Sequence, residues 1–112
     1  MAQILFATDF SPVAQNAATY ALHLAHYLGQ ELELFHAYII PFAYTDSPVP
    51  LLNVDEIQEI AEGSMDIEYA RLKGLMPGMQ LTKQIMPGDI IECLKEKIEL
   101  ESPMLIVMGT SG

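Results

Sequence analysis

The first apolar run of this chain and the residues behind it restrict the fold more than any other stretch. Residues 4–7 form a short, continuous apolar run, which is typical of a strand buried on both faces of a sheet. Thr8 and Asp9 follow directly, and Ser11-Pro12 then provides a helix start, with Ser at the N-cap and Pro in the first helical position. We therefore predict a strand that turns straight into a helix, with an acid at the turn.

The rest of the chain continues to alternate between strand-like and helix-like segments. An Ala row at helical spacing follows Ser11, and Gly29 is expected to end that helix. The Pro-rich segment 40–52 predicts a loop, either a surface connector or a flank of a ligand site. In all, we expect strands over 3–8, 31–39, 80–86 and 105–108. We expect helices over 12–28, from Asn53 to about residue 76, and after the cap Asp89. The apolar face of the last helix would comprise Ile91, Leu94 and Ile98.

This order of elements predicts an α/β fold with a doubly wound parallel sheet. The strands over 3–8 and 105–108 are the most apolar and belong in the middle, whereas Lys83 and an alternating pattern place 80–86 at an edge. With the strands numbered along the chain, we predict the order 3-2-1-4, which puts the third strand at an edge. It brings the carboxyl ends of the first and fourth strands together at the switch point, where open sheets bind ligands.

Composition excludes several classes of protein. A chain of 112 residues, 51% of them hydrophobic, fits one domain with a single core and is not disordered. The net charge of −10 disfavours binding to nucleic acid or to anionic membranes. No apolar run approaches the roughly 20 residues that cross a bilayer, and no signal peptide is visible. The single Cys fits a reducing compartment.

Two turns carry the candidate binding residues, and each has two interpretations. Asp9 either hydrogen-bonds a ligand at the end of its strand or helps to cap the following helix. Gly109 and Gly112, three residues apart after a buried strand, either let backbone N–H groups approach a phosphate or form an ordinary turn. The five Lys and Arg residues all lie away from the strand-to-helix turns, so an anionic ligand would need backbone N–H groups, a metal or groups from outside the chain.

Other reactive residue types are better explained by structure. His23 and His26 stand at metal-ligand spacing, but with no third ligand in view we expect both to be solvated. His36 lies in an apolar strand and is expected in the core, and Cys93 is expected to be a structural thiol. No Ser-His-Asp or Cys-His set can be assembled, so no catalytic residue is predicted.

With the two turns side by side, the chain resembles the universal stress protein family. The resemblance rests on ILFATDFS over residues 4–11 and LIVMGTSG over residues 105–112, and on Phe35-His36-Ala37 and Gly88-Asp89 between them. It implies a Rossmann-like, three-layer α/β domain that is cytoplasmic and usually dimeric. In the nucleotide-binding branch it also implies ATP at the switch point, accompanied by Mg²⁺ or Mn²⁺.

The resemblance also implies roles for individual residues. Ala7, Thr8 and Asp9 would meet the adenosine part of the nucleotide, and Ala37 would touch the adenine. Met108, Gly109 and Thr110 would line the site from the fourth strand. Gly109 and Gly112 would be the first two glycines of the family pattern G-x2-G-x9-G-[ST].

The sequence departs from the family pattern after Gly112. The remaining x9-G-[ST] segment, the crossover helix and the fifth strand are missing, so we expect residues 1–112 to be a C-terminally incomplete part of a single or tandem domain. The strand over 105–108 would then be an uncovered apolar edge. The leading hypothesis is a stress-response regulatory module that binds ATP. The alternative is a dimerisation or interaction module that binds no nucleotide. At most, slow ATP hydrolysis is expected.

Overall fold

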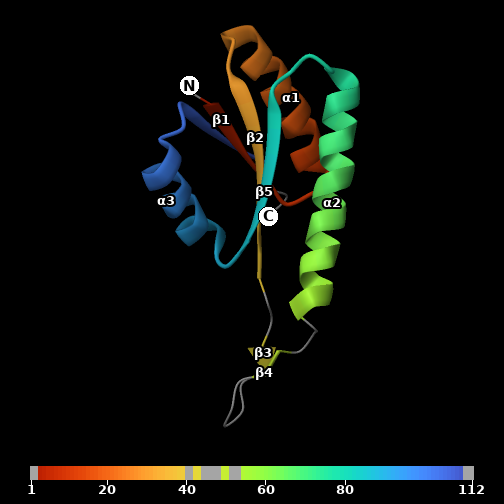
Figure 1. Cartoon of the computed structure of the whole chain (residues 1–112), viewed down its shortest axis with the longest axis vertical. Coiled ribbons are helices and arrows are strands. Elements are labelled where there is room, and N and C mark those ends of the chain that lie inside the picture. The colour runs from red at the N-terminus through yellow and green to blue at the C-terminus, as the bar shows by residue number, and fades with distance from the viewer. Residues whose placement is uncertain (1–2, 40–41, 44–48, 51–53, 110–112) are drawn as a thin grey trace.

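The computed structural model describes residues 3–39, 42–43, 49–50 and 54–109. Its main sheet has four parallel strands in the order β5-β2-β1-β6 (Figure 1). Counted along the sheet-forming strands, this is the predicted order 3-2-1-4. The elements are β1 (Gln3–Thr8), α1 (Pro12–Leu28), β2 (Glu31–Tyr38), β3 (Phe42–Ala43), β4 (Val49–Pro50), α2 (Val54–Leu75), β5 (Leu81–Pro87), α3 (Ile90–Glu101) and β6 (Leu105–Gly109).

Helices cover both faces of the sheet and give three layers. Helices α1 and α2 lie on one face and α3 lies on the other (Figure 1). The strands alternate accordingly: Ile4, Phe6 and Leu34 pack toward α1 and α2, whereas Leu5, Ala7 and Phe35 pack toward α3. The doubly wound three-layer sandwich predicted from the sequence is therefore confirmed.

The predicted helix ends are present. Ser11 caps α1, its Oγ accepting a hydrogen bond from the Ala14 N–H at 3.1 Å. Gly29 ends the same helix at φ 67°, the left-handed conformation that Gly adopts without a Cβ penalty. Asp89 caps α3 by accepting from the N–H groups of Ile91 and Glu92. Asn53, the predicted start of α2, lies outside the described residues, and the helix is described from Val54.

Close packing of α1 on the sheet follows from its small residues. Ala14, Ala18, Ala21 and Ala25 are all fully buried. Their short side chains let the helix lie near the strands, and the end of β6 passes directly against the helix at Gly109. Among the described helices, none is long and apolar enough to cross a membrane.

Three predictions about individual segments are wrong. The strand over 105–108, predicted in the middle of the sheet, is β6 at one edge of the four described strands. The segment over 40–52, predicted as a loop, contains the short antiparallel pair β3 and β4. Helix α3 does not bury its predicted Ile face: Ile91 and Ile98 are 51% and 45% exposed, and Leu94 is the one predicted member that is buried. The buried face comprises Cys93, Leu94 and Lys97.

Buried polar residues on the sheet explain why α3 is turned this way. The Lys97 amine lies 2.7 Å from a Glu33 carboxylate oxygen on β2 and 2.7 Å from Glu101 one helical turn later. It also donates to the side chain of Gln84 on β5, and it lies 5.7 Å from the centre of the Phe35 ring. A charged group buried on the sheet needs a partner, so the carboxylate selects the Lys face of α3 over the Ile face.

Candidate functional site

The turn between β1 and α1 is held by hydrogen bonds from its own side chains. Thr8 Oγ1 accepts from the Phe10 N–H at 3.0 Å, and Asp9 Oδ1 accepts from the Ser11 N–H at 2.9 Å. Between them Phe10 has a φ of 63°, which is rare for a bulky residue and costs roughly 1–3 kcal/mol. Asp9 therefore helps to cap the start of α1, as one of its two interpretations predicts. The same hydrogen bond fixes the position of its carboxylate.

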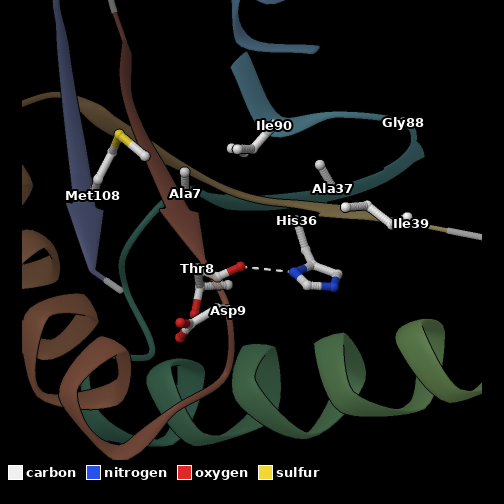
Figure 2. Close-up of a pocket in the computed structure, with 9 residues that line it drawn as sticks. All are labelled: Ala7, Thr8, Asp9, His36, Ala37, Ile39, Gly88, Ile90 and Met108. Carbon is white, nitrogen blue, oxygen red and sulfur yellow. Dashed lines mark hydrogen bonds between the residues drawn. The ribbon is translucent and has the colours of Figure 1, made fainter. Parts of the chain in front are cut away.

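His36 joins this turn to the end of β2. Its Nδ1 lies 2.7 Å from the carbonyl oxygen of Thr8, and its ring centre lies 4.4 Å from that of Phe10 (Figure 2). Because a carbonyl oxygen can only accept, Nδ1 is the donor in this hydrogen bond. His36 is half-buried at the edge of the core and helps to hold the left-handed Phe10 in place.

A pocket of about 170 Å³ opens at the carboxyl ends of these strands (Figure 2). This is smaller than the roughly 300–1,000 Å³ of a pocket that holds a whole drug-sized ligand, and it suits one ring system with part of a sugar. It lies at the predicted switch point, since β1 pairs with β2 on one side and with β6 on the other. The lining residues are Ala7, Thr8, Asp9, His36, Ala37, Ile39, Gly88, Ile90 and Met108.

The lining has an apolar half and a polar half. Ala7, Ala37 and Ile90 lie on the α3 side of the strands, together with Met108 (Figure 2). The side chains of Asp9 and His36 lie on the opposite side, toward α1 and α2. Such a division suits a ligand with a flat apolar part and a hydrogen-bonding part.

The structure brings together most of the residues singled out from the sequence. Ala7, Thr8, Asp9, Ala37 and Met108 all line the pocket. Thr110 and Gly112 lie outside the described residues, so their predicted roles stay predictions.

Four lining residues were missed by the sequence reasoning: His36, Ile39, Gly88 and Ile90. Each of them lies just before or after the carboxyl end of a strand, which is the signal that would have found them. His36 was instead assigned to the core because its neighbours in the strand are apolar.

Gly109 has a structural role that neither sequence interpretation included. A Cβ placed on it would lie 2.8 Å from Ala14 Cα and 2.9 Å from Ala17 Cβ, both closer than real Cβ contacts. The glycine is therefore required for β6 to pass against α1. Gly109 is buried and does not line the pocket.

The residues with charged side chains at the pocket are acidic. Asp9 is the one acidic residue of its lining, Asp89 follows directly after Gly88, and no Lys or Arg lines the pocket. Within the part of the chain that the structure describes, no group of three His, Cys, Asp or Glu side chains is arranged to hold a metal ion.

These features define the class of the molecule: a doubly wound α/β domain with a small amphipathic pocket at its switch point. The chain belongs to the universal stress protein family, whose model matches residues 1–112. No curated protein matches it significantly.

Solved structures of similar fold agree with this assignment. A universal stress family protein from Burkholderia pseudomallei is 26% identical with a TM-score of 0.77, and the match covers 96% of this chain and 81% of that one. A universal stress protein from Archaeoglobus fulgidus, solved in complex with dAMP, is 14% identical with a TM-score of 0.72, covering 96% and 80%. A third, solved in complex with cAMP, is 17% identical with a TM-score of 0.67, covering 93% and 73%.

Proposed function

We propose that this chain is a stress-response regulatory module that binds an adenine nucleotide in the pocket at the ends of β1, β2 and β6. The observation that carries the proposal is the amphipathic lining of that pocket at the switch point of the sheet. The dAMP and cAMP complexes of two proteins with the same fold support it. ATP, with Mg²⁺ or Mn²⁺ on its phosphates, is included among the proposed ligands.

Each half of the pocket suits one part of a nucleoside. The apolar half, with Ala37 and Met108, offers apolar contact to an adenine ring. The polar half offers hydrogen-bonding groups: the Asp9 carboxylate and the His36 ring. Ribose hydroxyls are donors, and an acid at the end of a strand is a suitable partner for them.

The proposal is tested by filling the apolar half of the pocket. Ala37→Leu places a branched side chain where the base would lie, so it should weaken adenosine and AMP binding by about tenfold or more in titration calorimetry. Ala70→Leu is the matched control, because Ala70 is exposed on α2 outside the pocket. Absence of binding to the unmodified chain at millimolar ligand would contradict the proposal, as would binding that Ala37→Leu leaves unchanged.

A second candidate function is suggested by the surface of β6. Leu105 and Met108 are 39% and 44% exposed, and Met104 before them is 52% exposed. In the sheet formed by the described strands, β6 has a neighbour on one side only. We propose an interaction surface here, for a homodimer or a tandem partner domain in the cytoplasm. An interaction module without nucleotide function would pair through β6 and bind no adenosine.

A further inference from the structure

We propose that the pocket selects adenine compounds of low charge, adenosine and AMP, over free ATP, and takes ATP only when a divalent cation offsets its charge. This inference rests on the proposed function and names the class of ligand within it. It is carried by the distribution of charge around the pocket and by the positions of every Lys and Arg in the sequence.

One acidic residue lines the pocket and a second stands beside it. The Asp9 carboxylate is part of the lining, and its place is fixed by the hydrogen bond from the Ser11 N–H. Asp89 stands next to the lining residue Gly88, at the start of α3. The whole chain adds a net charge of −10, which repels an approaching anion and repels it more with each added phosphate.

No cation of the chain is available to counter this field. The sequence contains five Lys and Arg residues, and all of them lie in the described part of the structure, engaged outside the pocket. Their contacts are Arg71 to Glu68 at 2.6 Å, Lys73 to the Met79 carbonyl at 2.7 Å, Lys83 to Asp66 at 2.5 Å, Lys95 to Glu92 at 3.9 Å and Lys97 to Glu33 at 2.7 Å.

Two of these cations are firmly held. Arg71 also donates to Thr19 Oγ1 and to the Gln15 carbonyl, so it ties α2 to α1. Lys97 is 3% exposed and lies on the α3 face of the sheet beneath its helix. Moving either side chain to a bound phosphate would break a helix contact, so neither supplies the positive charge that polyphosphate sites normally contain.

The test compares adenosine, AMP, ADP and ATP by titration calorimetry, first with a chelator and then with Mg²⁺. Without a divalent cation, we expect affinity to fall with each phosphate, by roughly tenfold or more from adenosine to ATP. Added salt should strengthen ATP binding by screening the repulsion while it leaves adenosine binding unchanged. Mg²⁺ should recover most of the lost ATP affinity.

Two variants separate charge from shape. Ile39→Lys adds a cation at the exposed rim of the pocket and should raise the affinity for ATP relative to adenosine by several-fold. Ile60→Lys is the matched control, since Ile60 on α2 is 69% exposed and Ile39 is 70% exposed. Asp9→Asn removes the charge but keeps an oxygen that accepts from the Ser11 N–H, and it should shift the ratio in the same direction.

The outcomes distinguish this inference from the proposed function. If adenosine binds and chelated ATP binds as tightly or more tightly, whatever the salt, the inference is overturned and the proposed function stands. An equal response to Ile39→Lys and Ile60→Lys would also overturn it. If neither adenosine nor ATP binds, both are overturned.

Discussion

At the scale of single residues, Gly109 shows how one glycine can be required for a reason unrelated to a ligand. The sequence offered phosphate binding or an ordinary turn, and the structure adds a steric need. The atoms that a Cβ would meet include the Ala14 Cα, which belongs to a helix backbone and cannot rotate away. A substitution must therefore shift β6 or α1 itself.

Gly109→Ala should destabilise the fold by about 1–3 kcal/mol, because overpacking at a backbone contact forces one element to move. Urea unfolding monitored by circular dichroism measures the change. Gly63→Ala is the control: Gly63 lies within α2 with no atom near its Cβ position, and Ala there should stabilise by about 0.5–1 kcal/mol. Equal stability of the two variants would contradict the steric role.

At the scale of elements, α3 is attached to the sheet through buried charge as well as apolar contact. Burial raises the pKa of Glu33 despite the nearby Lys97. Burial opposes the charged form of Lys97, but hydrogen bonds to Glu101 and Glu33 outweigh it and raise the pKa of the amine. The two groups therefore depend on each other, and neither should tolerate loss of its partner.

Lys97→Met should destabilise the chain by about 3 kcal/mol, because it leaves the Glu33 carboxylate buried beside an apolar side chain. Adding Glu33→Met should recover most of the loss, since a buried ion pair replaced by apolar groups of similar size is often neutral. Urea unfolding measures both changes. A double variant no more stable than Lys97→Met would contradict the mutual dependence.

Labelling of Cys93 gives an independent measurement on the same helix. This thiol is 4% exposed, and burial, followed by the carboxylates of Glu96, Asp89 and Glu92, raises its pKa. It should therefore react with a thiol reagent only when α3 opens. Lys97→Met should accelerate the reaction, and the double variant should slow it again.

The same helix shows what could be predicted from the sequence. The order of strands and the ends of α1 and α3 follow from local signals: apolar runs, Ser11 and Asp89 at the caps, and Gly29. The rotation of α3 does not, because it depends on a pairing between Glu33 and Lys97, which are 64 residues apart. A Lys on a helix normally indicates a solvent-exposed face. Nothing in the local sequence pattern shows that a buried carboxylate lies opposite this Lys on the sheet.

The candidate site divides in the same way. Asp9 could be placed at the switch point from the inferred strand order, whereas Ala37 and Met108 were predicted through the resemblance to the family. The contact of His36 with Thr8 and Phe10 could not be predicted, because it depends on the left-handed conformation of Phe10, which local propensity disfavours.

At the scale of the whole molecule, the two edges of the described sheet differ. The outer strand β5 carries Lys83 between Thr82 and Gln84, and its Lys is paired with Asp66 on α2. Charged and polar side chains of this kind discourage pairing with another chain. Strand β6 at the other edge has the sequence LIVMG, with no charge at all. Association between copies should therefore occur through β6 and not through β5.

Concentration-dependent association of the 112-residue chain provides the test. Leu105→Lys places a charge on the apolar edge and should weaken association by about tenfold or more in sedimentation velocity, because a buried unpaired Lys opposes strand pairing. Leu100→Lys is the control, since Leu100 is 80% exposed on α3 and gives the same change in net charge. If both variants weaken association equally, net charge and not the β6 edge controls it.

If only Leu105→Lys weakens association, the same strand both borders the pocket through Met108 and forms the interaction surface. Adenosine binding and association should then influence each other.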